Sequence, residues 1–203
     1  LVSALAFDPS ANVRLRALEA LYPHAEREVV RAGILAALPR EQNPLVQLEL
    51  IDFVATAQAL DDDMRKRIVR HQAERSPRYR TIESAIDVPL AIRNLHSGGA
   101  IVLDCLTMWV ANLVFAELSD DVILAHIDVL TETLVDAGRP VIVVTNEVGW
   151  GIVPADALSR RYRDSLGRCN QIVARASDRM FLMVCGQPFE IKNTSAPRKN
   201  RGV

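Results

Sequence analysis

Several features that would define a class of protein are scarce in this sequence. Only three cysteines occur, at positions 105, 169 and 185, which are too far apart for a zinc knuckle and odd in number for a disulfide framework. No apolar run reaches the roughly 18 residues that a membrane span needs, and no charged-then-apolar signal peptide opens the chain. These absences favour a protein of the reducing cytoplasm without a membrane span.

An excess of charge is also lacking. Twenty-four basic residues offset 25 acidic ones in a chain of 203 residues, so the formal net charge is −1. Nucleic-acid binding usually needs a basic patch, and only the tail from Lys192 to Arg201 is locally basic. We therefore expect no nucleic-acid partner. With 49% hydrophobic residues, the chain suits one or two globular domains.

The first segment, residues 1–53, has a helical and repetitive pattern. Breaks at Asp8-Pro9-Ser10 and Asn43-Pro44 each precede a helix start. The two starts are alike, because Val13 and Val46, Leu15 and Leu48, and Leu18 and Ile51 each lie 33 positions apart. The segment resembles HEAT-type repeats. Fewer than two repeats fit, so we expect it to lean on the rest of the chain or on a partner.

From residue 54 onward, strands alternate with helices. Short apolar or β-branched runs predict strands at 53–56, 100–104, 140–145 and 180–185, and residues 189–192 can pair with the last as a hairpin across Gly186. Helices are predicted over 61–75, through Trp109 and Leu113, over 120–137 and over 156–177. This alternation predicts an α/β fold with a mostly parallel sheet covered by helices.

Two of the predicted strands end on polar residues. Asp104 ends an Ile-Val-Leu run, and Thr145, Asn146 and Glu147 follow Val-Ile-Val-Val. Ligands of open α/β sheets bind beyond the carboxyl ends of the strands, so we expect Asp104 and Glu147 to face one crevice. A carboxylate such as Asp104 can hold Mg²⁺ beside nucleotide phosphates; a helix cap before Thr107 is the structural alternative.

His71 differs from the other histidines in its basic setting. It lies on the predicted 61–75 helix with Arg67, Arg70 and Arg75. A lone helical histidine is usually a surface or packing residue, and that interpretation stays open. Positive neighbours favour a bound anion, which suits a nucleophile that attacks phosphorus.

A series of short motifs runs in order through residues 54–192. They are Ala55-Thr56-Ala57-Gln58, Asp62-Asp63-Met64, Arg67-Ile68, His71 with Arg75, Arg80-Thr81-Ile82-Glu83, Leu103-Asp104-Cys105-Leu106-Thr107, the run from Thr145 to Pro154, Arg163-Asp164, and Gly167-Arg168-Cys169-Asn170-Gln171. Together these motifs closely resemble those of the bifunctional adenosylcobinamide kinase/adenosylcobinamide-phosphate guanylyltransferases of cobalamin biosynthesis.

The resemblance implies a P-loop-type α/β domain over residues 54–203 that carries out two reactions. One phosphorylates the aminopropanol hydroxyl of adenosylcobinamide from ATP or GTP, and the other passes GMP from GTP, through a guanylylated histidine, to the new phosphate. His71 matches that histidine. The residues implied to contact the nucleotide are Ala55, Thr56, Ala57, Gln72, Ala73, Glu74, Arg75, Glu83 and Asp104. Mg²⁺ is the implied metal, and a homo-oligomer is compatible with this family.

The sequence departs from the family at its start, where family members carry a strand and a Gly-rich loop ending Gly-Lys-Ser. The lysines here, at 66, 192 and 199, are followed by Arg or Asn, so no Gly-Lys-Ser/Thr loop can form within these residues. The helical segment stands in that place, as if spliced near 51–54. We therefore expect a sheet without its first, central strand and an impaired kinase.

The alternative function belongs to another class. The chain can instead be a non-catalytic helical-repeat interaction protein with a vestigial nucleotide-binding scaffold. Affinity for GTP at physiological magnesium separates the two interpretations.

Overall fold

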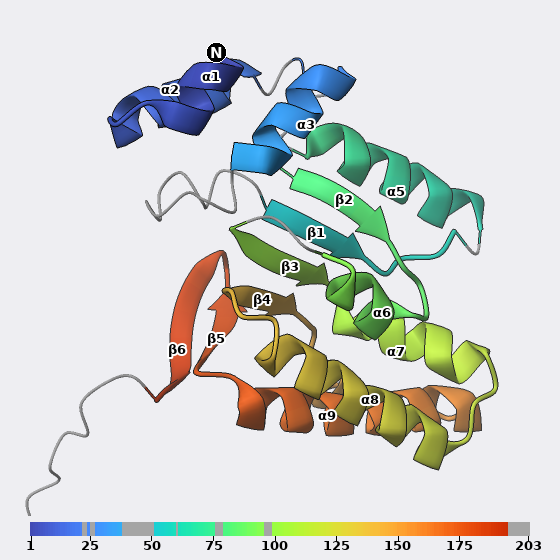
Figure 1. Ribbon diagram of the computed structural model, residues 1–203. Coiled ribbons are helices and arrows are strands. Elements are labelled where there is room, and N and C mark those ends of the chain that lie inside the picture. The colour runs from blue at the N-terminus through green and yellow to red at the C-terminus, as the bar shows by residue number, and fades with distance from the viewer. Residues whose placement is uncertain are drawn as a thin grey trace, which may run out of the picture.

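A parallel sheet of four strands, in the order β2-β1-β3-β4, forms the main body of the protein (Figure 1). The strands are β1 (Ile51–Ala55), β2 (Tyr79–Glu83), β3 (Ala100–Asp104) and β4 (Val141–Val144). The computed structural model describes residues 1–21, 24, 27–37, 51–59, 61–75, 79–95 and 99–194. The predicted α/β class with a mostly parallel sheet is confirmed.

Helices connect the strands, and side-chain caps fix where the longer ones begin. They are α5 (Asp62–Glu74), α6 (Val88–Arg93), α7 (Leu106–Phe115), α8 (Asp120–Val135), the 3₁₀ turn η3 (Val148–Trp150) and α9 (Ala157–Ala176). Asp61 accepts a hydrogen bond from the Met64 amide, and Asp156 accepts one from the Ser159 amide, each at 2.7 Å. The Ser159 amide also holds the pKa of Asp156 below its usual range. Each cap satisfies an amide that has no partner inside its helix.

The main hydrophobic core lies between one face of the sheet and α7, α8 and α9. Leu103 of β3, Trp109 of α7, Ile127 of α8 and Leu166 of α9 are fully buried in it. The Trp109 ring nitrogen donates to the Ile86 carbonyl at 2.9 Å, so its one polar group is satisfied. Burying each of the three aliphatic side chains contributes about 1.5–3 kcal/mol. No helix in the described part of the chain is long and apolar enough to cross a membrane.

The last two strands form a separate antiparallel hairpin rather than extending the sheet. β5 (Arg179–Val184) pairs with β6 (Gln187–Asn193). Cys185 and Gly186 form the turn with φ angles of 51° and 76°, the left-handed region that glycine tolerates best. The predicted hairpin across Gly186 is confirmed.

The N-terminal segment is helical, but the predicted boundary at residue 53 is too late, because β1 already begins at Ile51. Its helices are α1 (Val2–Phe7), α2 (Ala11–Leu21) and α3 (Glu28–Ala37), and they bury a small core of their own around Leu5, Leu18 and Ile34. The second predicted repeat start, residues 43–50, lies outside the described residues. Ile51, which was matched to Leu18 of α2, belongs to β1, because it pairs with both neighbouring strands. The HEAT-type resemblance and a division of the chain into two domains at 53/54 stay predictions.

A buried ion cluster ties the amino end of β1 to its surroundings. The Asp52 carboxylate is fully buried, and its two oxygens lie 2.6 Å from Arg80 Nε and 3.0 Å from Arg139 Nη1. Arg80 belongs to β2, and Arg139 precedes β4. A buried carboxylate is costly unless charged partners compensate it, so this cluster fixes the relative positions of three strands.

We predict that Asp52→Asn lowers the free energy of unfolding by about 3 kcal/mol, the low end of the range for breaking a buried ion pair, since Arg80 keeps 34% of its side chain exposed. Urea denaturation measures this change. As a control, Asp120→Asn removes the partner of Arg161 at a site where the carboxylate is 71% exposed, so we expect a loss below about 1 kcal/mol. Equal losses in the two variants would contradict a structural role for the cluster.

Candidate active site

A cleft of about 270 Å³ opens where β1, β2 and β3 end beside α5. In the sheet register, Ala55 pairs with Glu83 on one side and with Asp104 on the other, so the three strand ends lie at one level. The lining residues are Ala55, Ala57, Met64, Arg67, Ile68, Arg70, His71, Gln72, Arg75, Glu83, Asp104, Cys105 and Met108. Seven of the predicted site residues, Ala55, Ala57, His71, Gln72, Arg75, Glu83 and Asp104, therefore meet in one place.

Thr56 holds the loops under this cleft together instead of lining it. Its side chain is fully buried, and its Oγ1 donates to the Cys105 carbonyl at 2.8 Å and accepts from the Cys105 amide at 3.0 Å. The Asn112 side-chain amide donates to the carbonyls of Thr56 and Ala85, at 2.8 and 2.9 Å. The loops after β1, β2 and β3 are thus joined by buried hydrogen bonds, which are costly to break.

Helix α5 carries His71 and is held to the sheet by polar contacts, since none of its residues is buried. Gln72 Nε2 donates to the Glu83 carboxylate, and Arg75 donates to Thr81 Oγ1 at 3.3 Å. The Arg75 guanidinium also lies 4.0 Å from the centre of the Phe53 ring, a cation–π contact. Of the predicted residues on this helix, Ala73 and Glu74 are exposed and do not line the cleft.

Charge in the cleft is divided between its two walls. Arg67 and Arg70 come from α5 and Arg75 follows its last residue, whereas the carboxylates Glu83 and Asp104 come from strand ends. Within the described ranges no three His, Cys, Asp or Glu side chains form a metal cluster. One or two carboxylates with substrate phosphates are the usual ligands of Mg²⁺, so the donor set fits a magnesium ion that arrives with a nucleotide.

Thr145, Asn146 and Glu147 form a second cluster beyond the end of β4. Thr145 Oγ1 donates to Asn170 Oδ1 at 2.7 Å, and Asn170 Nδ2 donates to the Glu147 carboxylate at 3.1 Å. The Asn146 side chain donates to Thr107 Oγ1 at 3.0 Å. These residues follow β4, next to the strand that carries Asp104, but they bond to α7 and α9 and none of them lines the cleft. Asp104 and Glu147 thus follow neighbouring strands, and the expectation that they face one crevice stays a prediction.

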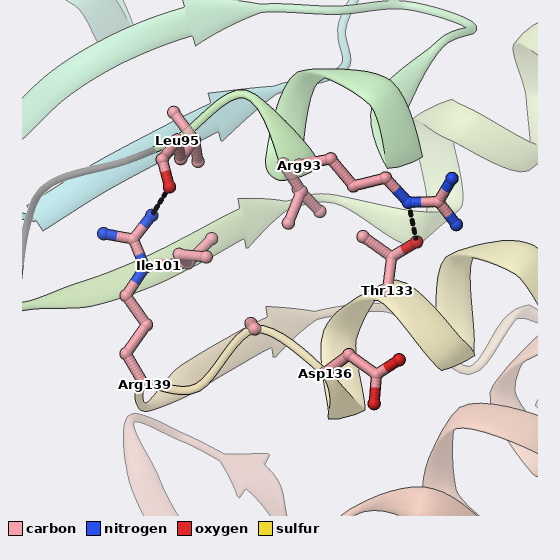
Figure 2. A pocket seen from close by; sticks show the side chains of 8 residues that line it. Arg93, Leu95, Ile101, Thr133, Asp136 and Arg139 are labelled. Carbon is pink, nitrogen blue, oxygen red and sulfur yellow. Dashed lines mark hydrogen bonds between the residues drawn. The ribbon is translucent and has the colours of Figure 1, made fainter.

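A second hollow, of about 220 Å³, lies toward the amino ends of the strands (Figure 2). Arg93 donates to Thr133 Oγ1 and Arg139 donates to the Leu95 carbonyl, each at 3.2 Å. Arg93 thus joins α6 to α8, and Arg139, which precedes β4, joins it to the chain after α6. None of the predicted site residues is among those that line this hollow. Because ligands of such sheets bind at the carboxyl ends, the cleft around Asp104 is the candidate active site.

A family model described as cobinamide kinase / cobinamide phosphate guanyltransferase matches residues 42–191. The chain belongs to this family. The bifunctional adenosylcobalamin biosynthesis protein CobP of Pseudomonas aeruginosa is 36% identical over 145 residues, which cover 70% of this chain and 82% of that protein. The corresponding protein CobU of Salmonella typhimurium is 37% identical over 153 residues, which cover 69% and 84%. The resemblance found in the motifs is thus confirmed.

In this member of the cobinamide kinase/guanyltransferase family, sequence reasoning missed part of the cleft wall. Met64, Ile68 and Met108 line the cleft, and Cys105 lies beside Asp104. All four lie within or next to the motifs given above, so those motifs could have indicated them. Burial raises the pKa of the Cys105 thiol, although amides at Thr107 and Met108 oppose the shift. Burial also raises the pKa of Cys169 to about 12.

We predict an order of thiol reactivity in the folded protein at pH 8. Exposed Cys185 should react first with a disulfide reagent, and Cys105 should react more slowly because its raised pKa leaves less thiolate. Cys169 should react only on unfolding, and the Cys105 rate should rise as the pH increases toward its pKa.

Adding GTP with Mg²⁺ should slow the reaction of Cys105 with the reagent and leave the other two rates unchanged, because only the Cys105 thiol lines the cleft. The Cys185→Ser variant removes the fast reaction of Cys185, so that the Cys105 rates with and without GTP can be compared directly. Protection of Cys169 but not of Cys105 would place the nucleotide elsewhere.

Proposed function

We propose that the cleft binds GTP and that His71 accepts its GMP group on the way to adenosylcobinamide phosphate. The observation that carries this proposal is the meeting of His71, three arginines and two carboxylates in one cleft at the strand ends. A histidine on an exposed helix is not remarkable in itself. Its presence in one cleft with Asp104 and Glu83, in a chain of this family, supports a nucleophilic role.

The transfer consists of two balanced steps. A ring nitrogen of His71 attacks the α-phosphorus of GTP, a P–N bond forms, the bond to the bridging oxygen breaks, and pyrophosphate leaves. A phosphate oxygen of adenosylcobinamide phosphate then attacks the same phosphorus, a P–O bond forms, and the P–N bond breaks to return free His71. The product is adenosylcobinamide-GDP. A covalent intermediate divides one difficult transfer into two easier ones.

The remaining lining residues would position the nucleotide. Arg70 of α5 and Arg75 at its C-terminal end would neutralise phosphate charge. Ala55 and Ala57 leave room for the ligand at the end of β1. Asp104, with Glu83 nearby, would hold Mg²⁺ with the phosphates. Bound there, Mg²⁺ supplies charge neutralisation at the phosphate oxygens. Thr56 would act only by holding the loops in place.

We predict that α-labelled GTP with Mg²⁺ gives a protein adduct that is labile in acid and stable in base, as a phosphoramidate should be. His71→Ala should remove this adduct completely. His126→Ala is the matched control, because His126 lies on α8 and bonds to the Val122 carbonyl outside the cleft. Label that persists in His71→Ala, or that disappears in His126→Ala, would refute the assignment.

The non-catalytic alternative makes a different prediction about binding. A vestigial scaffold would bind GTP weakly or not at all at physiological magnesium, and Asp104→Asn would then change nothing. An active site should bind GTP, and Asp104→Asn should weaken that binding by about tenfold, the effect of losing about 1.4 kcal/mol. Calorimetry on the wild type and this variant measures both values.

We further propose that these 203 residues have little or no kinase activity, because they contain no Gly-Lys-Ser/Thr loop. Phosphoryl transfer depends on converging backbone amides and one lysine at the β- and γ-phosphates. Arginines on a helix such as α5 cannot reproduce that arrangement of amides.

Losing even one preorganised hydrogen-bond donor lowers the rate by a factor of roughly 10²–10³. We therefore predict that these residues phosphorylate adenosylcobinamide more slowly than a family member with the loop, by at least that factor. Phosphate transfer from labelled ATP or GTP measures it. A chain grafted with a strand, Gly-rich loop and helix in place of residues 1–51 should recover the activity. A comparable rate without the graft would show that the loop is dispensable.

A further inference from the structure

The turn from Asp104 to Thr107, which joins β3 to α7, is held from two sides, and the second side carries our further inference. Asp104 lines the cleft. From the β1 side, the Thr56 hydroxyl bonds to both the amide and the carbonyl of Cys105. From the β4 side, Asn146 donates twice to Thr107 Oγ1, from its main-chain amide at 3.1 Å and from its side-chain amide at 3.0 Å. Residues that follow both neighbouring strands therefore fix the position of this turn.

The start of α7 has no side-chain cap of its own. Helices α5, α8 and α9 begin after Asp61, Ser119 and Asp156, and each of these side chains accepts a hydrogen bond from an amide of the first turn. Cys105 stands at the corresponding position of α7, where it makes no such bond, and sulfur is a weak acceptor. The position of this helix start therefore depends on contacts from other elements, and Asn146 supplies two of them.

Asn146 is itself held in place by α9. Asn170 donates from its side-chain amide to the Asn146 carbonyl and to the Glu147 carboxylate, each at 3.1 Å, and accepts from the Thr145 hydroxyl at 2.7 Å. Asn170 is only 7% exposed, and the residue before it, Cys169, is fully buried in the main core. The packing of the main core thus determines where the donors of Asn146 lie.

The hydrogen bonds of this cluster favour a supporting role over direct binding of a ligand. The Thr145 hydroxyl, the Asn146 main-chain amide and the side-chain amides of Asn146 and Asn170 all donate to other groups of the protein. Thr107 Oγ1 accepts two bonds from Asn146, which is the number of its lone pairs. A donor that binds a ligand has to be free to meet it, whereas these donors are occupied within the protein.

We propose that Asn146 is a positioning residue for the GMP transfer, and that it holds Asp104 in place through Thr107. This role rests on the proposed function, in which Asp104 holds Mg²⁺ together with GTP. Asp104 and Thr107 belong to one short turn, so a shift at one end of the turn displaces the other end. Groups that orient a metal ligand without touching the metal change the affinity for that metal. Asn146 should therefore affect only the part of GTP binding that depends on Mg²⁺.

Calorimetric titration of the chain with GTP, first with Mg²⁺ and then with EDTA, tests this role. Asn146→Ala should weaken GTP binding about threefold with Mg²⁺, which is within the range for the loss of one hydrogen bond. With EDTA, the variant and the wild type should bind GTP equally. Thr107→Val removes the acceptor of both bonds at nearly the same side-chain volume, so we expect about fivefold weaker binding with Mg²⁺. Thr107→Ser keeps the hydroxyl and should bind GTP as the wild type does.

Two further variants show where the effect originates. In an Asp104→Asn background, Asn146→Ala should change the affinity no further, because the carboxylate that it positions is already lost. Asn193→Ala is the matched control, since the Asn193 side-chain amide also donates over 3.0 Å at an exposed site, to Glu190 of the β5–β6 hairpin. Neither residue of that pair lines the cleft, so this variant should bind GTP like the wild type.

The adduct assay separates positioning from a general loss of stability. At limiting Mg²⁺, Asn146→Ala should form the labelled GMP adduct about threefold more slowly than the wild type. Raising the Mg²⁺ concentration about threefold should restore the rate, because the variant would differ only in its affinity for the metal. A variant that was merely less stable would not recover in this way.

Three results would overturn the role of Asn146: unchanged GTP binding in Asn146→Ala, equal weakening with Mg²⁺ and with EDTA, or a further loss of affinity in the Asp104→Asn background. Each of them leaves the proposed transferase activity standing, because the wild type still binds GTP and its adduct at His71 is measured separately. A wild type that binds no GTP would instead refute the proposed function, and the role of Asn146 with it.

Discussion

The pairing of β1 with strands on both sides is the constraint on which the rest of the site depends. It sets Ala55 level with Glu83 and with Asp104, residues that lie 28 and 49 positions away in sequence. A slip by one residue would turn each side chain to the opposite face of the sheet. The buried Asp52 ion cluster fixes this register at one end, and the hydrogen bonds of Thr56 and Asn112 fix it at the other.

Helix α5 is attached differently from the helices of the core. Trp109 of α7 and Ile127 of α8 are fully buried, whereas α5 buries no residue and meets the sheet through Gln72 and Arg75. Exposed polar contacts of this kind contribute little stability, so the helix can adjust at small cost. Such an attachment would suit the proposed role of His71, whose ring would have to approach a phosphate. The cleft is thus formed by loops that buried hydrogen bonds fix in place and by helix α5, which is attached only by exposed polar contacts.

Two clusters of polar side chains lie at the carboxyl edge of the sheet. The cleft around His71 and Asp104 brings together a nucleophile, cations and carboxylates. The cluster after β4 has polar groups that bond to one another and to α9, beside an edge without a strand in the described chain. The first cluster therefore contains the side chains of the proposed GMP transfer, whereas these 203 residues contain no Gly-Lys-Ser/Thr loop for the kinase reaction.

The sequence by itself determined the fold class, most of the elements after residue 60 and the family, because periodicity, caps and ordered motifs are local properties. The role of His71 stays a prediction. Sequence reasoning missed β2 and α6, which are short and only partly buried, and it placed Ile51 in a helix although β1 begins there. Tertiary structure alone decided which motif residues meet. Thr56 turned inward and Glu147 turned toward Asn170, since the direction of each side chain depends on partners far away in the chain.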